Sequence, residues 1–144
     1  MKPGVTNIKS GASLTFKDVD GTPAPHTLTI ADAADLPQTI DEVNGCAPAG
    51  GDPNAPPPSP NICNDTFQAA AQADPRIADG TFPGPGESEF LDLGGGGAGL
   101  DARLDTMLIG DASSLTVPVT APPGTTLHFM CVIHPWMQGT INVG

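Results

Sequence analysis

The stretch from Phe129 to Val143 reads Phe-Met-Cys-Val-Ile-His-Pro-Trp-Met-Gln-Gly-Thr-Ile-Asn-Val. It brings a thiol, an imidazole and a thioether together within seven residues, at Cys131, His134 and Met137. Apolar and polar residues alternate up to Cys131, which predicts a strand, and the proline after His134 predicts a short loop. Two imidazoles, one thiolate and a weak axial thioether form the ligand set of a type 1 copper site. A second histidine is therefore expected from elsewhere in the chain.

His26 is the candidate for this second imidazole. It opens the alternating segment His26-Thr-Leu-Thr-Ile30, and such a strand can pair beside the one that ends in Cys131. The chain has three histidines, and the third, His128, lies three residues before Cys131 on the same predicted strand. Its side chain should therefore point to the opposite face, and we do not expect it to be a ligand. Taken singly, each of these residues would more often be a core residue. Their combined spacing favours a metal site.

The same alternation of apolar and polar residues recurs along both ends of the chain. It predicts an all-β fold, and Pro118 is expected at an edge or an irregular stretch because proline cannot donate to a ladder. The predicted strands cover residues 5–8, 13–16, 26–30, 115–119, 127–131 and 140–143, with shorter ones at 90–93 and 106–109.

Glycine and proline are concentrated in the middle of the 144-residue chain. There are 18 glycines and 17 prolines, which excludes a helical bundle. We expect one domain over residues 1–144, with a Pro/Gly-rich insertion over residues 36–112. The insertion is loop-rich, and its one convincing helix is predicted over Thr66–Ala73, with Asn64 or Asp65 as the N-cap and a proline beyond its end.

Cys46 and Cys63 lie in this insertion. With Cys131 assigned to the metal, the other two form a natural pair, and a structural disulfide is the favoured interpretation. A redox pair or a second metal site is the alternative, although no Cys-x-x-Cys spacing supports it. A disulfide implies an oxidising compartment, so we expect a periplasmic or extracellular protein.

The charge balance excludes other classes of function. Sixteen acidic residues against five basic ones give a formal net charge of −11, which argues against nucleic-acid binding. No apolar run is long enough for a membrane span, and residues 1–20 lack the apolar core of a signal peptide. The acidic residues all precede Ala112, and the segment Ala112–Gly144 has no charged side chain.

The Cys-x2-His-x2-Met segment resembles the copper loop of the cupredoxins, the type 1 blue copper proteins, and is most similar to the plastocyanin and amicyanin group. The segments Leu14-Thr-Phe16 and Pro25-His26-Thr27 are similar to the strand and first histidine ligand of this family. The resemblance implies a Greek-key β-sandwich of about eight strands. It also implies one copper ion, cycling between Cu(I) and Cu(II), with His26, Cys131, His134 and Met137 as ligands. Thr27 replaces the family's common Asn, and its hydroxyl would have to join the two ligand segments with a shorter reach.

The resemblance further implies a one-electron carrier, not an enzyme. Four protein ligands leave no open coordination position for a substrate. Electrons would pass through the exposed edge of His134, where Pro135 and Trp136 form an apolar patch on which redox proteins dock transiently. Three alternatives remain open from the sequence: a copper carrier or storage protein, an electron-transfer domain of a larger copper oxidase or reductase, and a β-sandwich without metal.

Overall fold

Eight strands account for most of the regular structure in the computed structural model, which describes residues 4–19, 24–46 and 62–144. Every predicted strand is present, which confirms the all-β prediction, with boundaries shifted by one or two residues in most cases. The strands are β1 (Gly4–Ile8), β2 (Ser13–Lys17), β3 (His26–Ala31), β4 (Ser88–Leu91), β5 (Thr106–Ile109), β6 (Ser114–Pro118), β7 (Thr126–Met130) and β8 (Gln138–Val143).

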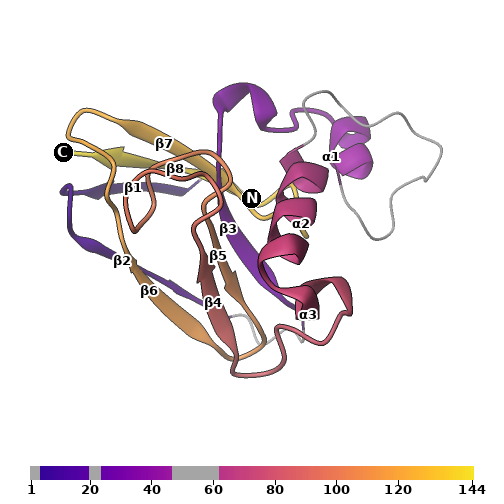
Figure 1. Ribbon diagram of the computed structural model, residues 1–144. Coiled ribbons are helices and arrows are strands. Elements are labelled where there is room, and N and C mark those ends of the chain that lie inside the picture. The colour runs from indigo at the N-terminus through magenta and orange to yellow at the C-terminus, as the bar shows by residue number, and fades with distance from the viewer. Residues whose placement is uncertain (1–3, 20–23, 47–61) are drawn as a thin grey trace.

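The strands form the two layers of a β-sandwich (Figure 1). The larger sheet has the order β1-β8-β7-β3-β5-β4, in which only β1 and β8 run parallel. The smaller sheet is the antiparallel pair of β2 and β6. Neighbours in the larger sheet are often distant in sequence, as the Greek-key prediction requires. Pro118 is the last residue of β6, so its missing N–H interrupts no continuing ladder.

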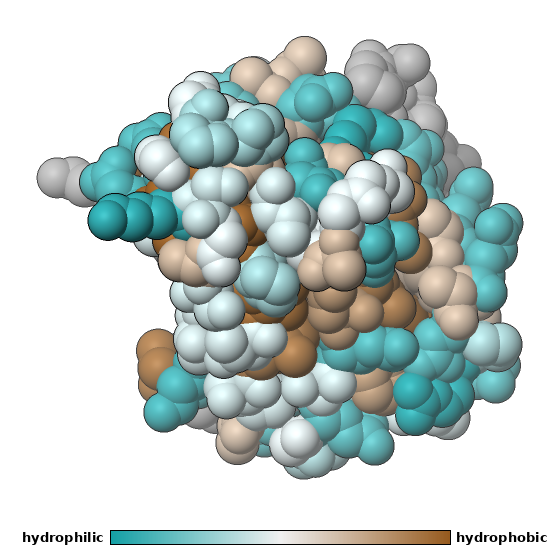
Figure 2. All heavy atoms as spheres, turned by 60° about the vertical axis from the view of Figure 1, so that its left-hand side comes forward, coloured by the Kyte–Doolittle hydropathy of each residue, from teal (hydrophilic) through white to brown (hydrophobic). Residues whose placement is uncertain are grey.

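The core between the two layers follows from the alternation of side chains along each strand. Leu28 and Ile30 of β3 pack there against Leu127 of β7 and Val117 of β6. Seen after a turn that brings the left side of Figure 1 forward, hydrophobic residues gather near the centre of the face, among pale and hydrophilic ones (Figure 2). Burial of the apolar side chains of the core, between the two sheets, is the main force that holds the sheets together.

Short helices cover the other face of the larger sheet, beside β3 (Figure 1). They are the 3-10 turn η1 (Ala33–Asp35) and the helices α1 (Ile40–Cys46), α2 (Ile62–Ala73) and α3 (Pro75–Ala78). A second apolar cluster lies between them and the sheet, and all six residues of β3 are buried because both of its faces are covered. Among the described residues, no helix has the length and apolarity that crossing a bilayer requires.

The helix prediction was right in place but wrong in extent. The helix α2 begins at Ile62, so neither Asn64 nor Asp65 is its N-cap. Ile62 and Cys63 are buried in the second apolar cluster, and this packing extends the helix beyond its local signal. The helices α1 and α3 were not predicted. In α3, Pro75 is the first helical residue, and Asp74 caps it by accepting a hydrogen bond from the Arg76 amide.

A disulfide joins Cys46 to Cys63, as favoured from the sequence. It links the last residue of α1 to the first turn of α2, and both sulfurs lie in the buried cluster against the sheet. Residues 47–61, which it encloses, lie outside the described residues. The disulfide therefore fastens the two helices to each other at the place where they contact the sheet.

The predicted insertion over residues 36–112 contains two different parts. Its first part supplies the helices, whereas its second part supplies β4 and β5 to the larger sheet. The glycine-rich loop between these strands is ordered by Asp105, whose carboxylate accepts hydrogen bonds from the amides of Gly94, Asp101 and Ala102. A side chain at Gly94 would collide with the Arg103 carbonyl oxygen. Close backbone packing thus explains this glycine.

Candidate metal centre

His26 and Cys131 come from adjacent strands of the larger sheet. His26 is the first residue of β3, and Cys131 directly follows β7. The two strands run antiparallel, with Thr29 opposite Met130, so the start of one lies beside the end of the other. His26 has the same parity as Leu28 and therefore faces the sandwich interior. Both His26 and Cys131 are buried, with exposed fractions of 6% and 2%.

The loop over residues 131–137 then turns back on itself between β7 and β8. The Cys131 amide donates to the Met137 carbonyl oxygen at 2.9 Å, and the Met137 amide donates to the His134 carbonyl oxygen at 2.9 Å. These bonds close the loop tightly and return His134 to the cysteine. Its Nδ1 lies 3.7 Å from the Cys131 sulfur.

Three of the four predicted ligands meet in this way. The ligand atoms of His26, Cys131 and His134 all lie within 4.8 Å of one another. The two imidazole rings have centroids 4.9 Å apart and are tilted by 39°. His128, in the middle of β7, is not a member of this cluster. The fold thus brings His26 together with Cys131 and His134, which lie in a distant segment of the sequence.

Met137 is the fourth predicted ligand. It is half-buried and is the last residue of the loop before β8 begins. Its backbone makes the two hydrogen bonds that close the loop on Cys131 and His134. Its position is therefore set by the same turn as the other two loop residues, and its role as a ligand stays a prediction.

The cysteine sulfur accepts hydrogen bonds from two backbone amides. The Thr27 amide lies 3.3 Å from Sγ and the His134 amide 3.4 Å. Amide donors directed at sulfur stabilise negative charge on it, as a thiolate ligand requires. Cys131 is a free cysteine and is not involved in the disulfide.

Thr27 joins the two ligand segments. Its hydroxyl accepts a hydrogen bond from the Val132 amide at 2.9 Å, and this bond is buried. The threonine hydroxyl therefore reaches the loop, despite being shorter than the asparagine side chain common at this position in plastocyanin-like proteins. With the bond from the Thr27 amide to the sulfur, a single residue positions both the ligand and the loop that carries it.

The surface beside His134 differs from the predicted patch in one residue. Trp136 is 55% exposed and meets the His134 ring edge to face, with centroids 5.3 Å apart. Pro135, in contrast, is fully buried and contributes no surface. Its carbonyl oxygen accepts a hydrogen bond from Gln138, whose side chain also donates to the Pro37 carbonyl oxygen. This contact, which no local signal predicted, holds the loop against the segment that leads into α1.

Comparison with known proteins gives matches among solved structures. No protein-family model and no curated protein matches the chain. An auracyanin from the photosynthetic bacterium Roseiflexus castenholzii shares 17% identity, with 99% of this chain and 86% of that chain covered and a TM-score of 0.45. Auracyanin A, a "blue" copper protein from Chloroflexus aurantiacus, shares 16% identity, with 99% and 87% covered and a TM-score of 0.46. The chain is similar to auracyanins.

The donor atoms of this chain fit copper. Two imidazoles and a thiolate meet at one point, and a thioether is carried by the same loop. Mixed nitrogen and sulfur ligands suit copper, whereas magnesium, calcium and manganese prefer oxygen. His26 and Cys131 are buried and His134 and Met137 are half-buried, so a bound ion would be partly shielded from water.

Proposed function

We propose that this chain is a cupredoxin-type electron carrier that holds one copper ion through His26, Cys131, His134 and Met137. The observation that carries the proposal is the meeting of the His26, Cys131 and His134 ligand atoms within 4.8 Å at the end of the sandwich. Bound copper would supply one-electron chemistry, because thiolate and thioether ligands favour Cu(I) and imidazoles favour Cu(II). The protein supplies the ligands and their fixed positions, and it catalyses no reaction of its own.

The ligands are positioned by contacts that do not depend on a metal. The pairing of β3 with β7 brings His26 and Cys131 to the same end of the sheet, and the bond between Thr27 and Val132 holds the loop beside β3. A site that keeps its geometry when the charge on the ion changes needs little reorganisation, which favours rapid electron transfer. The same rigidity is unfavourable for a copper carrier or storage protein, whose ligands have to release the ion readily.

The surface around Trp136 is the proposed docking face for redox proteins. Trp136 is exposed and contacts His134, which is half-buried and is a ligand in this proposal. The segment Ala112–Gly144 carries no charged side chain, so a partner that docks here has no ion of this segment to desolvate. An uncharged contact segment favours the transient contacts that electron carriers make.

The compartment is proposed from the disulfide. The bond between Cys46 and Cys63 is buried and joins two helices of the fold. Structural disulfides persist in oxidising surroundings, which supports a periplasmic or extracellular location.

Copper titration with variants tests the proposal. Cu(II) added to the copper-free protein should produce an intense visible absorption band at one equivalent, because a thiolate bound to Cu(II) absorbs strongly. Cys131→Ser should abolish this band. His128→Ala is the matched control, since this histidine lies near the site in sequence but outside the ligand cluster. A band that persists in Cys131→Ser, or that disappears in His128→Ala, would overturn the ligand assignment.

The rate of copper release separates the carrier from the electron-transfer proposal. We expect slow loss of copper to an excess of chelator, together with fast electron exchange between oxidised and reduced protein. Fast loss of copper with slow exchange would favour the carrier or storage alternative.

A further inference from the structure

A cavity of about 400 Å³ lies between the helices and the outer face of the larger sheet. Thr66 and Ala70 of α2 form one wall, and Leu91 of β4 and Leu108 of β5 form the opposite wall. Phe67, which is 44% exposed, lies at its rim. Protein interiors rarely contain voids of this size, and the volume falls within the range of small-molecule sites.

The lining of the cavity is almost entirely apolar. Ala70, Leu91, Leu108 and Val132 are all buried. The described residues that line it include no acidic, basic or histidine side chain. An ionic ligand would lose its hydration here without gaining a counter-ion, so the cavity selects a neutral molecule.

Thr66 adds a specific polar group to this apolar lining. It is 2% exposed, and its hydroxyl has no hydrogen-bond partner among the described residues. The hydroxyls of the two other lining threonines are used, since Thr27 accepts from the Val132 amide and Thr106 donates to the Leu104 carbonyl oxygen. A buried hydroxyl without a partner is costly, and a ligand with one hydrogen-bonding group would satisfy it.

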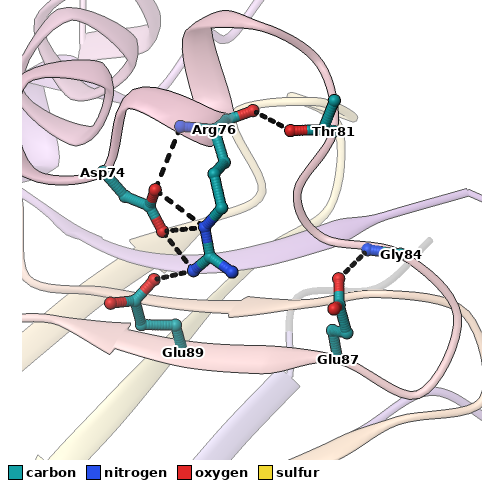
Figure 3. A network of polar contacts seen from close by, with 6 residues as sticks. All are labelled: Asp74, Arg76, Thr81, Gly84, Glu87 and Glu89. Atoms are coloured by element: carbon teal, nitrogen blue, oxygen red, sulfur yellow. Dashed lines mark hydrogen bonds and ion pairs between the residues drawn. The ribbon is translucent and has the colours of Figure 1, made fainter.

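The far end of the cavity is held by charged side chains outside its lining. Arg76 lies between Asp74, at the junction of α2 and α3, and Glu89 of β4 (Figure 3). The same guanidinium lies over the ring of Phe82, 4.4 Å from its centroid, and Phe82 lines the cavity. These contacts join the helices to the edge strand β4 at this end of the cavity.

We propose that this cavity binds a small, neutral, mainly apolar ring compound that carries one hydroxyl or carbonyl group bonded to Thr66. The size and lining of the cavity select the apolar ring, and the hydroxyl of Thr66 selects the polar substituent. The inference does not require the proposed electron-transfer function, because none of the four predicted copper ligands lines the cavity. The cavity does share Thr27 and Val132 with the contacts that hold the loop after β7.

Two probes that differ by one hydroxyl group test the proposal. Binding of 2-naphthol and of naphthalene to the full chain is followed by the fluorescence of each probe. The wild-type protein should bind 2-naphthol about tenfold more tightly than naphthalene, the effect expected of one buried hydrogen bond. Thr66→Val keeps the shape but removes the hydroxyl, and should bind both probes about equally.

Two variants on α2 distinguish binding in the cavity from binding elsewhere on the surface. Ala70→Leu fills the cavity and should weaken binding of both probes at least tenfold. Ala73→Leu is the matched control, because Ala73 lies on the same helix, is exposed and does not line the cavity. Circular dichroism confirms that each variant is folded. The proposal is wrong if neither probe binds the wild type, or if Ala70→Leu binds as the wild type does. A preference for naphthol that survives in Thr66→Val would overturn the role of Thr66.

Discussion

At the scale of single residues, Thr27 connects the two segments of the candidate metal centre, β3 and the loop after β7. Its amide donates to the Cys131 sulfur, and its hydroxyl accepts from the Val132 amide. Both bonds are buried, so water cannot replace them if they are lost. The loop that carries Cys131 and His134 therefore depends on a side chain far away in sequence.

Replacement of the Thr27 hydroxyl should destabilise the protein. Thr27→Val leaves the Val132 amide buried without its acceptor, which costs about 1–3 kcal/mol. The free energy of unfolding of the copper-free protein, measured in urea, should fall by this amount. Thr27→Ser is the control because it retains the hydroxyl. Equal stability of the valine and wild-type proteins would show that the bond contributes nothing.

Met137 provides a second test at this scale. Its thioether is a soft donor, whereas the amide oxygen of glutamine is harder and favours Cu(II) over Cu(I). Met137→Gln should therefore lower the reduction potential of the copper-loaded protein and keep its visible colour, as followed by a spectroelectrochemical titration. Met107→Leu, a change in the fully buried core, should leave the potential unchanged. The same potential in Met137→Gln and the wild type would exclude the thioether as a ligand.

At the scale of elements, the helices are joined to each other by a disulfide and to the rest of the fold by ion pairs. The disulfide between α1 and α2 lies at one end, and the Arg76 contacts with Asp74 and Glu89 lie where α2 meets α3 (Figure 3). Arg103, from the loop that leads to β5, adds ion pairs to Asp35 and Asp65. The pair of Arg76 with Glu89 thus joins the helical layer to β4, and the pairs of Arg103 join it to the loop before β5.

The ion pair of Asp74 and Arg76 should appear in the pH dependence of stability. Hydrogen bonds from Arg76 lower the pKa of Asp74 to about 2, whereas burial raises the pKa of the neighbouring Glu89. The stabilisation from Asp74 is therefore complete above its ordinary pKa of 3.8 and is lost as the pH falls from about 4 to about 2.

Urea unfolding of Asp74→Asn tests this expectation. The variant should be less stable than the wild type at pH 5.5, and the difference should disappear near pH 2. Asp79→Asn, a change at an exposed aspartate near the same helix, should follow the wild type. A difference between Asp74→Asn and the wild type that is the same at both pH values would rule out the pair as its source.

At the scale of the whole molecule, the charge is distributed unevenly along the chain. The formal net charge is −11, and none of it lies in the final segment from Ala112 to Gly144. Under the proposed function, the acidic residues would attract a basic partner over distances that salt shortens, and the surface around Trp136 would make the contact itself.

Electron transfer to a basic redox protein should therefore slow as ionic strength rises. Stopped-flow rates should fall between about 10 mM and about 150 mM salt, since the Debye length decreases from about 30 Å to about 8 Å. Trp136→Ala should lower the rate at every salt concentration, because it alters the contact and not the long-range attraction. Val5→Ala, at an exposed position of the edge strand β1, is the control. A rate independent of salt would show that the acidic residues do not steer the partner.

The strands were predictable because they follow from the local alternation of apolar and polar residues. The candidate ligands His26, Cys131, His134 and Met137 were predictable because few residues of the chain carry that chemistry. The pairing of Cys46 with Cys63 was predictable because the third cysteine, Cys131, was assigned to the metal site. Four features were not predictable. They are the start of α2 at Ile62, the burial of Pro135, the hydrogen bond from Gln138 to Pro37 and the cavity beside Thr66. Each of these depends on which distant segments pack together. Local patterning thus determined which residues form the strands and the loop that carries Cys131, His134 and Met137. Only the tertiary structure decided what surrounds them, because packing between distant segments has no counterpart in local spacing.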